Sequence, residues 1–111
     1  MKKEIYVAFV SEKLKSSFNS LKEGKFEDKN LYTQIDGSIG ELKKNPNSGI
    51  KIPKHLWPKD YIHKYGITNL WKYNLLNSWR LIYTIETNEI RIISIILEWF
   101  SHKDYERKFK Y

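Results

Sequence analysis

The order of strand-like and helix-like segments along the chain predicts an α+β fold. One strand and two helices come first, an irregular stretch follows, and three strands in quick order precede a last helix. Strands and helices that are grouped in this way are typical of the class. The 111 residues suffice for one compact domain and are too few for two, so we expect a single domain over residues 1–111.

The first part of the chain predicts a strand and a pair of helices. Residues 5–10 are apolar at nearly every position, which suits a strand buried on both faces. Ser11 is a helix N-cap residue, and Gly24 ends the helix that it begins. Apolar residues recur at helical spacing after this cap: Leu14, Phe18 and Leu21.

A second helix is expected from about Glu27 to Lys44, closed by the Asn-Pro pair at 45–46. Gly37 and Gly40 lie within it, and their small size permits close packing against a neighbour. Its apolar stripe is formed by Leu31, Ile35, Ile39 and Leu42.

Residues 45–69 are expected to be irregular, because all three prolines of the chain fall there. Trp57–Asp60 predicts a single helical turn, with Pro58 at its first position. A long loop inside a small domain more often has a function than serves only as a connection.

The last third of the chain predicts a three-strand meander and a helix. The three strands are expected over Leu70–Leu75, Trp79–Glu86 and Glu89–Leu97, with tight turns at 77–78 and 87–88. The third strand is apolar on both faces, which indicates a central place in the sheet. Ser101 is expected to cap the last helix, since Asp104 follows it three residues later.

The net charge of +7 is concentrated in the middle of the chain. Residues 41–80 hold eight basic and two acidic side chains, a net charge of +6. A basic stretch interleaved with aromatic residues favours a nucleic acid as partner, and a solubilising lysine-rich loop is the alternative. The interleaved aromatic residues are Trp57, Tyr61, Tyr65, Trp71 and Tyr73.

Composition excludes several kinds of site. The chain has no cysteine, so a disulfide scaffold, a zinc ribbon, an iron–sulfur centre and a thiol nucleophile are excluded. No Gly-rich phosphate loop occurs and the three histidines are scattered, so we expect neither a cofactor nor a metal. No apolar run is long enough to cross a membrane, and the basic, then apolar, amino terminus has no cleavage site for a signal peptide. We therefore expect a cytoplasmic protein that does not bind a membrane.

A group of chemically active residues follows Ser101. His102 and Lys103 would occupy the first turn of the last helix, where free N–H groups attract an anion and favour a neutral imidazole. Tyr105 lies on the same helical face, and Arg80 on a neighbouring strand is within reach. A proton acceptor, a donor and cations around a phosphate suffice to cleave RNA without a metal. The alternative is that His102 only begins the helix and Tyr105 only packs.

The same residues resemble the RelE/ParE superfamily of type II toxins, and most closely its archaeal members. The resemblance is carried by Leu70–Leu75, by Trp79–Tyr83, and by the isoleucine-rich strand that leads to His102–Tyr105. It implies two helices on a largely antiparallel sheet of about four strands with a short C-terminal helix. It also implies an endoribonuclease that cuts messenger RNA on the ribosome, leaves a 2′,3′-cyclic phosphate, inhibits translation and is silenced by a cognate antitoxin.

Roles carry over to matching positions of this chain. The resemblance implies that Arg80 contacts the scissile phosphate, and Lys72 matches the first basic position of the preceding strand in the family. His102 lies where some relatives have a catalytic histidine, and Tyr105 lies near the C-terminal tyrosine of others. We expect that Lys72 or Lys103 assists Arg80, and that His102 and Tyr105 handle protons. From the basic stretch and its interleaved aromatic residues we also expect an RNA surface, formed by Lys51, Lys54, Lys59, Lys64 and Trp71 together with Arg107.

The chain departs from the family pattern at two points. Asn74 stands at the second basic position of its strand, and the Glu that some relatives use as a base has no counterpart. ParE-like members act on gyrase and are not nucleases, so fold alone does not fix the activity. The alternative function is a binding protein of the same fold, either a gyrase-directed toxin or an inactive relative that binds RNA or an antitoxin.

Overall fold

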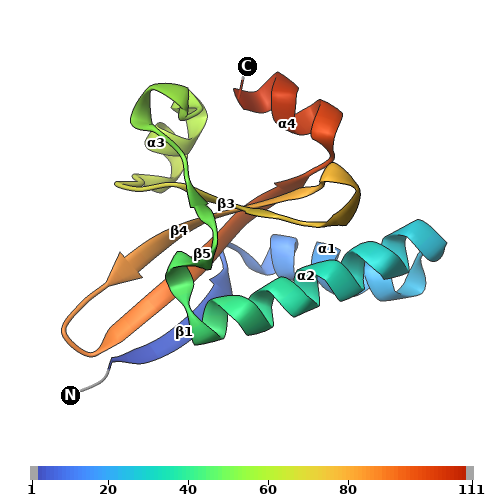
Figure 1. The fold of residues 1–111 in the computed structure, drawn as a ribbon, viewed down its shortest axis with the longest axis horizontal. Helices are drawn as coiled ribbons and strands as arrows, with labels where there is room; N and C mark the ends of the chain where they lie inside the picture. The colour runs from blue at the N-terminus through green and yellow to red at the C-terminus, as the bar shows by residue number, and fades with distance from the viewer. Residues whose placement is uncertain (1–2, 110–111) are drawn as a thin grey trace.

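A computed structural model describes residues 3–109 and shows a mixed sheet of five strands with four α-helices (Figure 1). The strands are β1 (Glu4–Phe9), β2 (Ile50–Lys51), β3 (Trp71–Asn74), β4 (Arg80–Thr87) and β5 (Arg91–Phe100). The helices are α1 (Glu12–Ser20), α2 (Phe26–Lys44), α3 (Lys59–Tyr65) and α4 (His102–Phe109). This confirms the α+β class and corrects the expected strand number from four to five.

The strand order is β1-β5-β4-β3-β2. β1 runs parallel to β5, and the other three pairings are antiparallel. β5 is central, as its sequence predicts. The fifth strand is β2, whose two residues pair with Lys72 and Trp71. It lies in the stretch expected to be irregular, because two residues are too short to show an alternating pattern.

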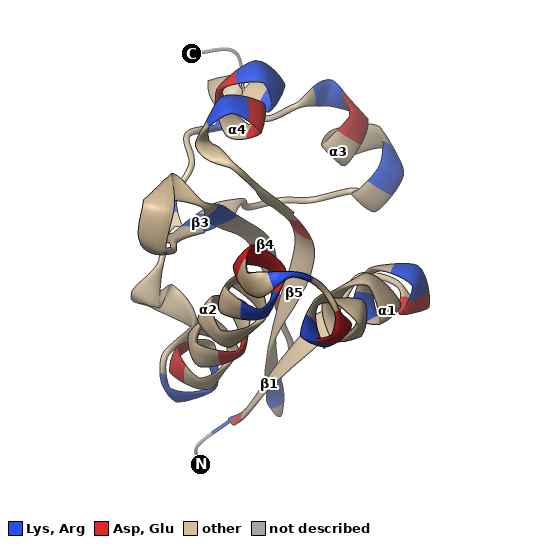
Figure 2. Cartoon of the chain, turned by 90° about the vertical axis from the view of Figure 1, so that its right-hand side faces the viewer, with Lys and Arg blue, Asp and Glu red and all other residues tan. Residues whose placement is uncertain are grey.

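The helices lie on both sides of the sheet, α1 and α2 on one side and α3 and α4 on the other (Figure 2), and each face carries an apolar cluster. The helices α1 and α2 cover one face, where Phe18 and Ile35 pack with Tyr83. The helices α3 and α4 cover the other face, where Tyr61 and Tyr105 pack with Ile82, Leu97 and other buried residues. Since successive residues of a strand point to opposite faces, the two strands β4 and β5 contribute to both clusters.

A β-bulge interrupts the alternation in β5. Ile82 pairs with Glu98 and Tyr83 pairs with Ile96, which leaves Leu97 as the extra residue. As a result Leu97 and Glu98 both serve the face under α3 and α4: Leu97 is buried in that cluster, and Glu98 accepts a hydrogen bond of 2.6 Å from the Tyr61 hydroxyl.

Several local predictions are confirmed. The Ser11 hydroxyl accepts a hydrogen bond from the Leu14 N–H at 3.1 Å and caps α1. α2 ends at Lys44, before the Asn-Pro pair. The Ser101 hydroxyl accepts from the Asp104 N–H at 3.3 Å at the start of α4.

Other local predictions give the right kind of element but place its ends wrongly. α1 ends at Ser20, and a 3-10 turn over Leu21–Glu23 continues to Gly24. The single turn expected near Pro58 is α3, which continues to Tyr65 and ends at Gly66 with φ 59°. The three meander strands begin one or two residues later than expected, and β4 and β5 also end later.

Two packing predictions are also wrong. Alternate residues of β1, including Tyr6, are exposed, so the strand is not buried on both faces. It is an edge strand whose Val7 and Phe9 pack on the side of α1 and α2, while the alternate residues face outward and are exposed. Gly37 and Gly40 do not permit a close contact, because a Cβ at either position meets no atom within 4 Å. Both glycines are exposed.

No helix within residues 3–109 has the length and apolar character needed to cross a membrane.

Candidate active site

Lys72, Arg80 and Tyr105 meet on the sheet face covered by α4. Lys72 pairs with Ile82, and Arg80 pairs with Asn74, in the antiparallel ladder between β3 and β4. Lys72 and Arg80 are therefore diagonal neighbours on one face, a separation that long side chains can span. The helix α4 follows β5 directly, and its buried face places Tyr105 above both cations.

Both cations lie against the ring of Tyr105. The Lys72 Nζ is 5.2 Å from the ring centre, and the Arg80 Cζ is 5.4 Å from it. Tyr105 is 2% exposed, and its ring stacks on that of Phe109 at 4.6 Å. The aromatic ring thus holds two positive charges close together, through the attraction of a cation for the face of a π-system.

Arg80 has unused hydrogen-bonding capacity. Its Nη1 donates a long bond of 3.4 Å to the Trp79 carbonyl, and its Nε is buried with no hydrogen-bond partner among the described residues. A buried donor without a partner carries a desolvation cost. An oxyanion at this position would accept from the guanidinium and relieve that cost.

His102 and Lys103 are exposed in the first turn of α4. The His102 Nε2 lies 2.7 Å from the Glu106 Oε1, one helical turn further along. The structure thus groups His102 with a carboxylate of its own helix, at a position one turn before Tyr105. Glu106 is a partner that the sequence reasoning missed, although the spacing of four residues was a signal for it.

Glu98 of β5 is a further carboxylate on the sheet face covered by α3 and α4. Sequence reasoning missed it, because regular alternation does not reveal a bulge. Burial, and then the bond to Glu98, raise the pKa of the Tyr61 hydroxyl. Glu98 lies on β5, two strands away from Lys72 on β3. It is held by the hydroxyl of Tyr61 of α3.

The lysines predicted to bind RNA are spread along the segment that connects β2 to β3. Lys51 lies on the edge strand β2, and Lys54 lies in the 3-10 turn that follows. Lys59 begins α3, and Lys64 lies near its end with its Nζ 5.3 Å from the Tyr65 ring centre. All four are exposed.

Trp71 pairs with Lys51 in the sheet, but its ring lies on the face covered by α1 and α2. Its ring stacks on Tyr83 at 6.1 Å, in the cluster beneath α1 and α2, and its indole N–H donates to the Asn69 Oδ1 at 3.1 Å. Lys72 and Trp71 are adjacent on β3 and therefore serve opposite faces. The structure does not bring Trp71 together with Lys72 and Arg80.

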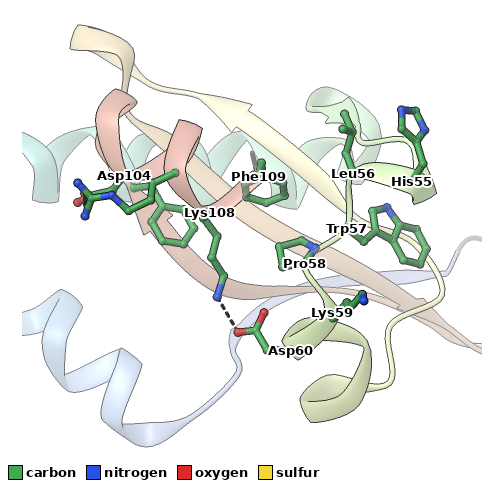
Figure 3. Close-up of a pocket in the computed structure, with 11 residues that line it drawn as sticks. His55, Leu56, Trp57, Pro58, Lys59, Asp60, Asp104, Lys108 and Phe109 are labelled. Atoms are coloured by element: carbon green, nitrogen blue, oxygen red, sulfur yellow. Dashed lines mark hydrogen bonds and ion pairs between the residues drawn. The ribbon is translucent and has the colours of Figure 1, made fainter. Parts of the chain in front are cut away.

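A groove of about 740 Å³ separates α4 from the segment that leads into α3 (Figure 3). Its apolar lining comes from Leu56, Trp57, Pro58, Phe100 and Phe109. Its charged lining comes from Lys59, Asp60, Asp104, Arg107 and Lys108. Two of the residues predicted to bind RNA, Lys59 and Arg107, thus lie on opposite sides of one groove.

An ion pair joins the two sides of this groove. The Lys108 Nζ of α4 lies 2.6 Å from the Asp60 Oδ2 of α3 (Figure 3). The hydrogen bond from Lys108 lowers the pKa of the Asp60 carboxyl. Arg107 lies 3.9 Å from Asp104. Both carboxylates of the groove are therefore close to a cation.

Within residues 3–109, no three His, Cys, Asp or Glu side chains are placed to hold a metal ion.

Comparisons of the chain with models of protein families, with curated proteins and with solved structures found no match. The resemblance to the RelE/ParE toxins therefore depends on the residues that carry it in this chain and on the chemistry of the site itself.

Proposed function

We propose that the protein is the toxin of a type II toxin–antitoxin system and a metal-independent endoribonuclease that cleaves messenger RNA, on the ribosome. The observation that carries the proposal is the meeting of Lys72 and Arg80 over the ring of Tyr105. Two cations and a phenol on one face supply charge stabilisation and a proton donor for a phosphodiester.

The chemistry follows from these groups. The 2′-hydroxyl of one nucleotide attacks its own 3′-phosphorus and gives its proton to a base. The bond to the 5′-oxygen of the next nucleotide breaks, and that oxygen takes a proton from a donor. Arg80 and Lys72, with Lys103, stabilise the charge on the non-bridging oxygens, and Tyr105 is the proton donor. The products are a 2′,3′-cyclic phosphate and a 5′-hydroxyl.

His102 is assigned the role of the base. A hydrogen on its Nε2 bonds to Glu106 at 2.7 Å, which leaves the Nδ1 as the proton acceptor. Glu106 would then fix the tautomer and orientation of the ring, as second partners of catalytic histidines do.

A specific observation favours the second candidate, a binding protein of this fold without nuclease activity. Tyr105 is 2% exposed and stacks on Phe109, so its ring has a packing role whether or not its hydroxyl transfers a proton. If Tyr105 only packs, Lys72 and Arg80 would bind RNA phosphate or an antitoxin, and the protein would not cleave RNA.

We also propose that a cognate antitoxin covers the positively charged surface around Lys72 and Arg80. A gene for a small acidic protein next to this one would be the candidate, because its charge complements the net charge of +7. Co-expression should yield a co-purifying complex and restore growth. A protein that is harmless alone and captures nothing would contradict the toxin assignment.

The activity is tested by primer extension on messenger RNA incubated with purified protein, with and without ribosomes. The proposal predicts new 5′ ends that depend on ribosomes and that carry a hydroxyl group and no phosphate. Intact messenger RNA under both conditions, from a protein that still binds RNA, would favour the second candidate.

A further inference from the structure

The groove between α4 and α3 adjoins the site but has no role in the cleavage chemistry. Phe109 lines the groove and stacks on Tyr105 at 4.6 Å. Phe100 also lines it and is paired in the sheet with Arg80. The groove and the two cations over Tyr105 thus both border the same short helix, whose diameter is about 10 Å.

The lining of the groove combines flat apolar surfaces with positive charge. The Trp57 ring is fixed by a hydrogen bond of 2.8 Å from its indole N–H to the Ile52 carbonyl. Lys59 is exposed and, among the described residues, makes no ion pair. Asp60 is bonded to Lys108, and Asp104 lies near Arg107, so the carboxylates are largely neutralised.

This combination fits a nucleotide. A base needs an apolar or aromatic surface on which to lie, and the phosphate beside it needs a cation. A volume of about 740 Å³ is within the range that holds small ligands. The charge of the surrounding segment also favours an anion, since residues 41–80 carry a net charge of +6.

We propose that the groove between α4 and α3 binds an unpaired base of the RNA substrate, a few nucleotides from the phosphate held by Arg80 and Lys72. Lys59 and Arg107 contact the phosphates on either side of that base, and Trp57 contributes to its apolar surface. The inference rests on the proposed function and adds to it a subsite that sets which RNA is bound productively.

The test is binding of short labelled RNAs of two, four and eight nucleotides, measured by fluorescence anisotropy. Their riboses carry 2′-O-methyl groups, so they have no attacking hydroxyl and are not cleaved. For the chain as it stands, affinity should rise with length, because the longer RNAs reach the groove. The variants Lys59→Glu and Trp57→Ala should lose about tenfold in affinity for the eight-nucleotide RNA and little for the dinucleotide.

Two controls match these variants. Lys43→Glu reverses an exposed charge on α2, and Phe26→Ala removes an aromatic ring that is 81% exposed. Both should bind every RNA as the unchanged chain does. Circular dichroism checks the fold, and Lys59→Glu keeps the test decisive if Trp57→Ala does not fold, because Lys59 is exposed.

The outcomes separate the groove from the active site. If Arg80→Ala weakens binding at every length while Lys59→Glu and Trp57→Ala bind normally, the inference about the groove is wrong and the proposed function stands. If the groove variants bind RNA normally but lose capture of an acidic protein partner, the groove is a protein-docking surface and the inference is also wrong. If the groove variants lose affinity for the eight-nucleotide RNA as predicted while the unchanged chain cleaves no messenger RNA, the base-binding groove is supported and the nuclease proposal is wrong.

Discussion

The guanidinium carbon of Arg80 lies 5.4 Å from the centre of the Tyr105 ring, although the two residues belong to a strand and a helix that are separated by another strand in the sequence. The contact exists because β5 lies beside β4 and leads directly into α4, which turns back over the sheet. Lys72 approaches the same ring from β3 at 5.2 Å. The fold thereby holds two cations together where they would otherwise repel each other.

The segment that carries the basic loop depends on a close approach at Gly49. A Cβ at this position would lie 2.5 Å from the Tyr83 hydroxyl and 2.6 Å from the Lys72 carbonyl oxygen, which is backbone of β3. We expect Gly49→Ala to lower the free energy of unfolding by about 1–3 kcal/mol, since the sheet edge must shift. Urea unfolding measures this.

Gly37→Ala is the matched control. A Cβ at Gly37 meets nothing within 4 Å, and the residue lies in the interior of α2. This variant should gain about 0.5–1 kcal/mol, because alanine favours the helix. Equal effects of the two substitutions would show that the packing of Gly49 against Tyr83 and β3 does not constrain the segment.

The exposed lysines outside the groove should contribute to RNA affinity through their charge. Replacing Lys51, Lys54 and Lys64 by alanine should reduce the slope of log affinity against log salt by about 0.7 for each phosphate of a single strand that the protein no longer neutralises. Binding to an uncleavable RNA is measured from low to high salt. The control replaces three exposed lysines of α1 and α2: Lys15, Lys29 and Lys43. A slope that responds equally to both sets would mean that the loop is only solvated surface.

The ion pair between Lys108 and Asp60 should make stability depend on acid pH. The pKa of Asp60 is lower in the folded protein than its ordinary value of 3.8, so the pair stabilises the fold above that value. The contribution disappears as the pH falls through the folded pKa. Because the side chain of Asp60 is 58% exposed, we expect a small effect of about 0.2–1 kcal/mol.

Urea unfolding of Asp60→Asn against the unchanged chain measures this contribution. The difference should be present at pH 7 and shrink once the pH is below 3.8. Asp36→Asn on the exposed side of α2 should show no such difference. A difference for Asp60→Asn that stays constant down to low pH would contradict the assigned ion pair.

The local part of the fold could be predicted from the sequence. Caps at Ser11 and Ser101 and the central place of β5 depend on residues close in sequence or on a run of apolar residues. What could not be predicted depends on long-range packing. The bulge at Leu97 appears only when two strands are paired, and the groove forms only when α3 is placed beside α4.

The candidate site also has features that the sequence predicts and features that appear only in the folded structure. The convergence of Lys72 and Arg80 follows from strand spacing across a short turn, so their proximity could be expected. The opposite orientation of Trp71 also followed from its adjacency to Lys72 on a strand, a signal that the prediction of an RNA contact did not use. The pairing of His102 with Glu106 follows from helical spacing, but the close approach of the two side chains, 2.7 Å, is known only from the structure.

The nuclease proposal is tested most directly by single-turnover cleavage of ribosome-bound messenger RNA, comparing Arg80→Ala, Tyr105→Phe and His102→Gln with Lys43→Ala as the control. The account predicts that Arg80→Ala lowers the rate about 100- to 1000-fold. Tyr105→Phe keeps the packed ring and removes only the hydroxyl, so the fold should persist while the rate falls about 100-fold or more, as it should for His102→Gln. Circular dichroism should be unchanged in every variant. Cleavage by Arg80→Ala and Tyr105→Phe at the rate of the unchanged chain would contradict an active site at the meeting of Lys72, Arg80 and Tyr105.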